Sequence, residues 1–345
     1  MMTGNLVIKS DNLKAMQWLL DNGYKGKIDL VYIDPPFATG GVFSMDKDGR
    51  VATISKSADS TVAYKDTLQG KEFIEFLRER VVLIRELLSD VGSLYLHIDY
   101  KVGHYVKVML DEVFGIDHFR NDITRIKCNP KNFERVGYGN IKDMILFYSK
   151  GDKPIWNSPK VKSSQEEIAK LYNKIDANGR RYTTVPIHAP GETNNGETNK
   201  PFRGILPPKG RHWRCSIEEL EKLDAMGLIE WSSKGNPRKI NYAEDHLTKK
   251  AQDIWEFKDP AYPVYPTEKN LEMLKFIIEA SSTVDSIVMD CFCGSGSTLL
   301  AADICSRKWI GIDQSDMAIQ TTRNRFSDRT LFDDEKKYKY IDLNS

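Results

Sequence analysis

Residues 286–313, SIVMDCFCGSGSTLLAADICSRKWIGID, restrict the fold of this chain more than any other stretch. An apolar run ends at Asp290, Gly294 and Gly296 follow, and a helical pattern begins at Ser297. This order predicts a strand, a tight turn and a helix. A second apolar run then ends at Asp313. A strand, helix and strand in this order predict two parallel strands joined by a crossover helix.

The same alternation occurs toward both ends of the chain. The predicted strands are 6–8, 28–33, 93–98, 122–127, 143–148, 286–289 and 309–312, and the predicted helices are 12–21, 71–88, 105–113, 268–281, 297–305 and 316–325. Such a series is typical of an α/β fold with a doubly wound, mainly parallel sheet that helices cover on both faces.

The middle of the chain has a different texture. From about 155 to 255 prolines and glycines multiply and the regular alternation is lost. Residues 151–250 contain 18 Lys and Arg against 13 Asp and Glu, a net charge of +5, whereas the whole chain carries +1. This fits a polyanion-binding module, although the count alone also fits ordinary solvated charge. We therefore expect an irregular insertion in one sheet domain that both ends of the chain build.

Composition excludes several classes of protein. The chain is 40% hydrophobic and 29% charged, and it has no apolar run long enough to span a membrane. The N-terminus lacks the pattern of a secretory signal. Its five cysteines are an odd number without a Cys-x-x-Cys pair, which favours reduced thiols and predicts no metal site. We expect a cytoplasmic protein.

The glycine turn predicts a ligand site, with three ligands to compare. A loop for nucleoside triphosphates needs a lysine where Ser297 and Thr298 stand, and a dinucleotide fingerprint needs a small residue where Leu299 stands. Asp290 at the strand end would repel a pyrophosphate but suits a cation, such as the amino group of S-adenosylmethionine. Asp313 is placed to accept hydrogen bonds from ribose hydroxyls. A turn without a ligand is the plain alternative.

A second motif, Asp34-Pro35-Pro36-Phe37, directly follows the predicted strand 28–33. On its own it also fits a strand-ending turn with a capping aspartate. Together, DPPF and FCGSG resemble the two motifs of the amino-group DNA methyltransferases, in which a D/N/S-P-P-Y/F tetrapeptide is catalytic and F-x-G-x-G binds the cofactor.

The order of the motifs, with DPPF first and the glycine loop last, resembles the permuted β class of this family, which includes type II and type III restriction-modification enzymes. The likeness also covers GSLYLHID, DEVFG, GRHWR, GLIEWSSKGNPRK, YPTEK and RKWIGID, and is weakest across about 155–205. Two positions depart from the pattern: Phe37 stands where Tyr is commoner, and Cys291 replaces the usual proline. Cytosine-5 methyltransferases need a Pro-Cys pair, which this chain lacks.

The resemblance implies site-specific methylation of DNA on an exocyclic amino group of a flipped base, with S-adenosyl-L-methionine as cofactor. Asp34 and the Pro35 carbonyl would accept hydrogen bonds from that amino group and aim its lone pair at the methyl group. The rigid Pro36 would hold this geometry, and Phe37 would stack on the base. The leading Asp favours adenine N6 over cytosine N4.

The resemblance implies these further assignments. The catalytic residues are Asp34, Pro35, Pro36 and Phe37; the cofactor-binding residues are Asp290, Phe292, Gly294, Ser295, Gly296, Ser297, Asp313 and Lys269; the DNA-binding residues are Arg211, Trp213, Arg214, Lys234, Arg238 and Lys239. The domains are a catalytic half, 1–154, a target-recognition region, 155–255, a cofactor-binding half, 256–330, and a tail, 331–345. His97 is equally a residue near the target base or a structural histidine.

The partners expected from the resemblance are double-stranded DNA, a second copy of the chain as a homodimer, and a restriction endonuclease, with no membrane. Other readings stay open. A methyltransferase for RNA or protein amides also uses such a tetrapeptide, and a relative without turnover could keep the fold and bind DNA. The recognition sequence depends on side-chain geometry that the sequence does not contain.

Overall fold

The computed structural model describes residues 4–35, 42–45, 51–52, 61–65, 70–130, 136–191, 193, 196–260, 268–327 and 338–344. The chain forms two compact units: a sheet unit, Met1–Pro159 with Gln252–Ser345, and an inserted unit, Lys160–Ala251. Residues 155–159 and 252–255, which the sequence analysis assigned to the insertion, belong to the sheet unit.

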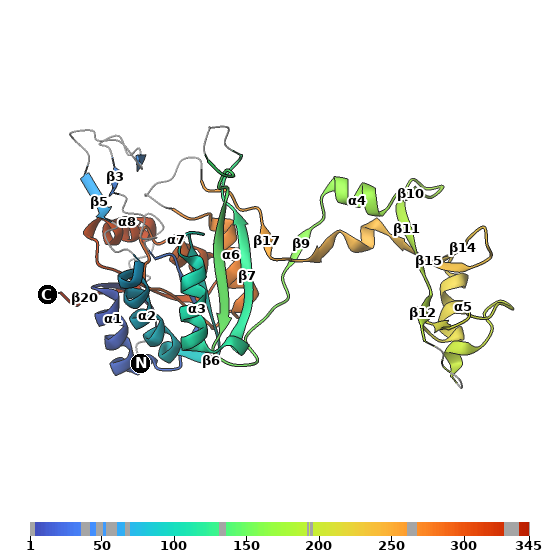
Figure 1. Ribbon diagram of the computed structural model, residues 1–345, viewed down its shortest axis with the longest axis horizontal. Helices are drawn as coiled ribbons and strands as arrows, with labels where there is room; N and C mark the ends of the chain where they lie inside the picture. Colours follow the sequence, from blue (N-terminus) through green and yellow to red (C-terminus); the bar gives the residue numbers. More distant parts are fainter. Residues whose placement is uncertain are drawn as a thin grey trace. The chain divides into compact units, whose positions relative to one another are not determined.

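A sheet with helices beside it forms the centre of the sheet unit (Figure 1). It has nine strands in the order β17-β7-β8-β6-β2-β18-β19-β1-β20. Its strands are β1 (Asn5–Lys9), β2 (Ile28–Ile33), β6 (Leu88–Ile98), β7 (Phe119–Ile126), β8 (Lys142–Ser149), β17 (Ile254–Trp255), β18 (Ile287–Asp290), β19 (Lys308–Asp313) and β20 (Tyr338–Asp342). Only β8 is antiparallel to its neighbours in this sheet. The described sheet therefore has the mainly parallel character that the sequence predicted.

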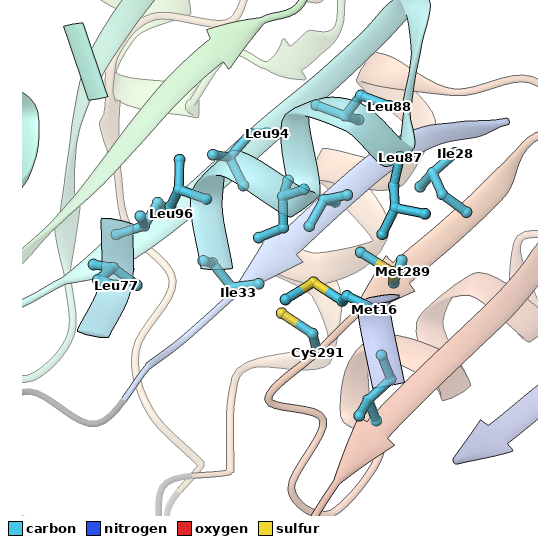
Figure 2. Close-up of a cluster of buried hydrophobic side chains, with 14 of the residues drawn as sticks. Met16, Ile28, Ile33, Leu77, Leu87, Leu88, Leu94, Leu96, Met289 and Cys291 are labelled. Carbon is cyan, nitrogen blue, oxygen red and sulfur yellow. The ribbon is translucent and has the colours of Figure 1, made fainter. Parts of the chain in front are cut away.

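Helices pack on both faces of the sheet, because the strands alternate two sets of apolar side chains. Leu94 and Leu96 belong to the core shared with α1 (Asn12–Leu19), α2 (Gly70–Leu87) and α3 (Gly103–Phe114). Figure 2 shows part of this core, which contains Met16 from α1, Leu77 from α2, and Ile33, Met289 and Cys291.

The opposite face carries the second core. Leu30 and Val288 pack there with residues of α6 (Leu271–Ser281), α7 (Ser297–Ile304) and α8 (Asp316–Ser327). Burying both faces of a parallel sheet in this way is the doubly wound arrangement that the sequence predicted.

Several predicted boundaries move in the structure. The first helix ends at Leu19 and continues as a wider turn, Leu20–Tyr24, in which Gly23 has a φ of 85°. β6 begins at Leu88, five residues earlier than expected, and runs through Gly92. A side chain at Gly92 would lie 2.8 Å from the backbone oxygen of Ile28. The strand can therefore pass so close to β2 only because this residue is glycine.

The predicted tail, 331–345, contains a strand that the sequence analysis missed. β20 pairs in parallel with β1, with Val7 opposite Tyr340. A small antiparallel sheet of β3 (Val42–Met45), β4 (Val51–Ala52) and β5 (Thr61–Lys65) and a short helix, Ile116–His118, were also not predicted.

The inserted unit is built from short elements around a small core. These elements are β9 (Lys160–Lys162), α4 (Gln165–Leu171), β10 (Lys174–Ile175), β11 (Arg181–Pro186), β12 (His188–Pro190), a helical turn (Glu197–Asn199), β13 (Arg211–Trp213), α5 (Ile217–Ala225), β14 (Ile229–Trp231), β15 (Pro237–Tyr242), a second helical turn (Ala243–His246) and β16 (Thr248–Lys250). The core comprises Ile187, Phe202, Trp213 and Leu220. Across the described part of the chain, no helix has the length and apolar character needed to cross a membrane.

Candidate active site

Three aspartates lie at the carboxyl ends of three neighbouring parallel strands. Asp34 follows β2, Asp290 ends β18 and Asp313 ends β19. β18 pairs with both neighbours, with Met289 opposite Val31 on one side and Asp290 opposite Gly311 on the other. The chain changes direction across the sheet at this point, which is where ligands bind in open α/β sheets.

Asp34 holds its two carboxylate oxygens in different environments. Oδ2 lies 2.7 Å from the ammonium nitrogen of Lys269, and both side chains are largely buried. Oδ1 is buried and has no hydrogen-bond partner among the residues described. The nearest ring nitrogen, Nδ1 of His97, is 3.9 Å away. A buried acceptor left unpaired costs free energy, so Oδ1 is suited to receive a donor from a ligand.

His97 belongs to a buried chain of side chains behind Asp34. Its Nε2 lies 3.2 Å from Oδ2 of Asp143, and its Nδ1 lies 2.8 Å from the hydroxyl of Tyr32. Burial lowers the pKa of His97, so the ring is neutral at pH 7. Because a carboxylate only accepts, Nε2 carries the ring proton and the Tyr32 hydroxyl donates to Nδ1. This supports the structural alternative for His97.

Asp143 is the last of these hydrogen-bonded side chains, and two cations hold its carboxylate in place. Lys127 Nζ lies 2.6 Å from its Oδ1, and Arg125 Nη1 lies 3.6 Å from its Oδ2. Burial would raise the pKa of Asp143, but the hydrogen bonds from His97 and Lys127 outweigh it and hold the pKa well below its usual range. Asp143 is therefore ionised, and it fixes the orientation of the imidazole.

The glycine loop is organised around Asp290. Its Oδ1 accepts from the backbone N–H of Phe292 at 2.9 Å, and its Oδ2 accepts from the hydroxyl of Thr298 at 2.6 Å. Burial raises the pKa of Asp290 to about 7, and the nearby charges of Asp34 and Asp313 add to this effect. Among the described residues Asp290 makes no ion pair, so a cation bound here would favour its charged form.

Asp313 holds the other side of the loop. Its Oδ2 accepts from the backbone N–H of Gly294 at 2.9 Å, and its Oδ1 accepts from that of Ser315 at 2.9 Å. Both oxygens keep further lone pairs for a ligand hydroxyl. Gly296, with a φ of 76°, is the N-cap of α7, and no side chain among the described residues makes a capping hydrogen bond there. Its first N–H groups are thus available to a ligand.

The remaining predicted cofactor residues surround this loop. Phe292 is half-buried and its ring lies 6.3 Å from that of Phe76. Ser295 and Ser297 are buried, with their hydroxyl oxygens 3.2 Å apart. Lys269 was also assigned to cofactor binding, and in the structure its ammonium group contacts Asp34.

Three of the predicted DNA-binding residues gather in the inserted unit around His188. Arg211 Nη1 lies 3.2 Å from His188 Nδ1, and Arg214 Nε donates to the His188 carbonyl at 3.3 Å. Burial, followed by the charges of Arg211, Arg214 and Arg238, lowers the pKa of His188. We call Arg211, Arg214 and Arg238 the arginine cluster. The sequence did not single out His188.

Trp213 does not belong to this cluster, and its predicted role in contacting DNA is wrong. The indole is 1% exposed, packs against Phe202 and donates from Nε1 to the carbonyl of Lys200 at 2.9 Å. It is a core side chain of the inserted unit. Lys234 is exposed, whereas Lys239 is half-buried.

Two predicted catalytic residues, Pro36 and Phe37, lie outside the described residues. Pro35 is buried directly after Asp34. Within the described ranges, no group of three or more His, Cys, Asp or Glu side chains is placed to hold a metal ion.

Comparison with known proteins adds a family to this geometry. A family model described as DNA methylase, of the N6/N4 type, matches residues 28–324. The type II methyltransferase M.EcaI of Enterobacter cloacae is 44% identical over 329 residues, which cover 94% of this chain and 69% of that protein. The Mod subunit of the type III restriction-modification enzyme StyLTI of Salmonella typhimurium is 28% identical and covers 85% of this chain. The chain spans only 49% of that subunit.

Solved structures agree at the level of the fold. TTHA0409 from Thermus thermophilus, described as a DNA modification methylase and solved with S-adenosyl-L-methionine, has a TM-score of 0.51 at 13% identity. The match covers 99% of this chain and 100% of that one.

Proposed function

The chain belongs to the N6/N4 family of DNA methylases, and from this membership we propose that it methylates the N6 amino group of adenine in double-stranded DNA. One observation carries the proposal. Asp34 holds one carboxylate oxygen on Lys269 and leaves the other buried, without a hydrogen-bond partner among the described residues, at the end of the strand that pairs with β18.

The residues of the glycine loop fit S-adenosyl-L-methionine as the cofactor. The buried carboxylate of Asp290 suits a cationic group, Asp313 keeps lone pairs for ribose hydroxyls, and the uncapped start of α7 offers N–H donors. Phe292, Gly294, Ser295, Gly296 and Ser297 form the loop between these groups. When bound, the cofactor supplies an electrophilic methyl group.

Asp34 provides what an exocyclic amino group lacks. The lone pair of such a nitrogen is delocalised into the base ring, which makes it a poor nucleophile. A hydrogen bond from one N–H to Asp34 Oδ1, and one from the other N–H to the Pro35 carbonyl, would localise the lone pair and aim it at the methyl group. Positioned acceptors in a site with little water are worth about 3–4 kcal/mol of barrier each.

The target base must leave the duplex to reach Asp34. Flipping costs a few kcal/mol, and Phe37 would recover part of this by stacking. The arginine cluster, with Lys234 and Lys239, would bind the DNA of the recognition site. Arginines in a cluster suit phosphate and guanine contacts, and three of them lie close enough to lower the pKa of one histidine. A restriction endonuclease would act with the protein on the same site, and a homodimer remains part of the proposal.

The test is chemical analysis of the product. The purified protein is incubated with cofactor and DNA of varied sequence, and the DNA is digested to nucleosides for mass spectrometry. N6-methyl-2′-deoxyadenosine in the DNA digest supports the proposal, and N4-methyl-2′-deoxycytidine would replace adenine by cytosine as the target. Methylation of RNA but not DNA would move the protein to another substrate class.

A further inference from the structure

We propose that Lys269 is a positioning residue for methyl transfer, which acts through Asp34 by binding Oδ2 of its carboxylate so that Oδ1 faces the substrate amino group. The inference rests on the proposed function, because it assigns a role at the same site. It differs from the role in cofactor binding that the sequence predicted for this lysine.

The ion pair fixes one end of the carboxylate. Lys269 Nζ lies 2.7 Å from Asp34 Oδ2, in the range of a charge-assisted hydrogen bond. The two side chains are only 12% and 15% exposed, so solvent screens the pair weakly. With Oδ2 held, rotation of the carboxylate is restricted and Oδ1 points to a defined place.

On the other side of Asp34, Oδ1 has no hydrogen-bond partner within the described part of the chain. The Tyr32 hydroxyl donates to His97 Nδ1 at 2.8 Å, and the His97 Nε2–H is directed at Asp143. Nδ1 uses its lone pair to accept from Tyr32 and carries no proton that it could donate to Oδ1, which lies 3.9 Å away. Asp34 thus has one oxygen bound to a cation and one acceptor that no described residue occupies, which is the geometry that an amino group requires.

Lys269 is itself held in place by its two neighbours in the sequence. Glu268 Oε1 lies 2.6 Å from Arg325 Nη2, and that nitrogen lies 3.3 Å from the hydroxyl of Ser295 in the glycine loop. Asn270 caps α6 by accepting from the backbone N–H of Met273 at 3.0 Å. The backbone at Lys269 is therefore anchored on both sides, which reduces the entropy lost when its side chain is ordered.

Helix stability does not explain a lysine at this position. Lys269 directly precedes the N-cap of α6, where the partial positive charge of the helix disfavours a cation. The carboxylate of Asp34 offsets this repulsion. The presence of Lys269 at this unfavourable position is therefore better explained by its ion pair with Asp34.

The test is a double-mutant cycle on the intact chain. K269M removes the charge but keeps the length of the side chain, and D34N keeps an acceptor oxygen without a charge. The single-turnover rate at saturating cofactor and DNA, and the Kd of cofactor measured by calorimetry, are recorded for wild type, both single variants and the double variant. K275M is the matched control, because Lys275 pairs only with Glu272 on the surface of the same helix among the contacts described.

The inference predicts that K269M slows transfer about 100-fold, while the cofactor Kd changes less than about threefold. K269R restores part of the rate. In the D34N background, K269M slows transfer less than about threefold further, because the charge on which Lys269 acts is absent.

Three results would overturn the inference: a normal rate in K269M, full additivity with D34N, or a weakened cofactor Kd with a normal rate at saturation. The last result would mean that Lys269 binds the cofactor, as the sequence predicted. If K269M loses its cooperative unfolding transition, K269Q takes its place under the same criteria. Absence of methyl transfer by the wild type would instead contradict the proposed function, so the two failures are distinguishable.

Discussion

The hydroxyl of Thr298 donates a hydrogen bond of 2.6 Å to the carboxylate of Asp290 and so joins the end of β18 to the first turn of α7. This bond lowers the pKa of Asp290, but burial outweighs it and raises the pKa to about 7. The carboxyl group is consequently about half protonated at neutral pH. A ligand that prefers one of its protonation states will bind with an affinity that depends on pH.

We expect cofactor affinity to rise with pH from 6 to 8. A cation beside Asp290 requires the carboxylate, so at pH 6 binding must first release a proton, which costs up to about tenfold in affinity per pH unit below the pKa. Calorimetry in two buffers with different ionisation enthalpies measures the proton released. T298V removes the hydroxyl and should move the midpoint to higher pH. An affinity that is independent of pH in both proteins would contradict this role of Asp290.

The D34A variant should lose methyl transfer and still bind the cofactor. Removing the acceptor for the amino group should slow the single-turnover rate by about 10³-fold. Binding should persist because the glycine loop and its hydrogen bonds do not include Asp34. Rapid-quench assays and calorimetry measure the two quantities. Near-normal turnover by D34A would refute the role assigned to the DPPF motif.

The D143N variant should be less stable than the wild type at pH 7. It removes the anion that Lys127 and Arg125 share, but Arg125 keeps its ion pair with Asp259 and Lys127 is partly exposed. We therefore expect a loss of about 1–3 kcal/mol. The folded state lowers the pKa of Asp143, so its contribution is complete above the ordinary pKa of about 4 and decreases as the pH falls through the lowered value.

Urea unfolding at several pH values measures this difference. The gap in unfolding free energy between D143N and the wild type should be constant from pH 5 to 7 and should narrow in acid. A gap that is absent at pH 7 would mean that Asp143 carries no net stabilisation.

Replacing Trp213 by alanine should unfold the inserted unit without affecting the cofactor site. Truncating a buried tryptophan costs about 3–5 kcal/mol, and the core of this unit is small. Limited proteolysis should then cut within 160–251, while calorimetry finds the cofactor Kd unchanged. W213F should lie between alanine and the wild type. A W213A protein that resists proteolysis but loses DNA affinity would restore the DNA contact that the sequence predicted.

R214A and R211A should weaken the part of DNA binding that depends on salt and not on base sequence. Each lost phosphate contact should reduce the slope of log K against log salt by about 1. Fluorescence anisotropy at several salt concentrations gives both quantities. K222A serves as the control, since Lys222 pairs with Glu218 on the exposed face of α5. Equal effects of K222A and R214A would argue against a specific role for the arginine cluster.

The elements that sequence reasoning located best are those whose pattern is complete within one segment. β2 spans Ile28–Ile33 as predicted. An apolar run indicates a buried strand, and the double proline that follows it marks where the strand ends. The turn between β18 and α7 was equally visible, since its glycines and Asp290 are adjacent in the sequence. Such local signals were enough for the fold class and for the three aspartates at the edge of the sheet.

Contacts between distant segments could not be predicted. Nothing in the sequence near Lys269 indicates that its partner is Asp34. The hydrogen-bonded side chains of Tyr32, His97 and Asp143 come from three strands, and only the register of the folded sheet brings them together. Trp213 was misassigned because it lies between two arginines, a composition that suits a nucleic-acid surface and equally a strand with one buried residue.

β20 escaped prediction for a related reason. Its sequence, YKYID, mixes apolar and charged residues, and β20 is an edge strand of the sheet. A lysine on an edge strand commonly prevents pairing with a further strand. A strand of this kind has a weak apolar signal. Its assignment depends on the partner strand, β1, at the opposite end of the chain.

The pairing of the first and last strands of the inserted unit affects how this unit can change during evolution. β9 and β16 pair with each other, with Val161 opposite Lys249, so the chain enters and leaves this unit at adjacent points. A segment attached in this way can be replaced, lengthened or exchanged between genes without altering the register of the nine-stranded sheet. Under the proposed function, selection on the inserted unit can change which DNA is recognised while the proposed methyl-transfer site at Asp34 stays as it is.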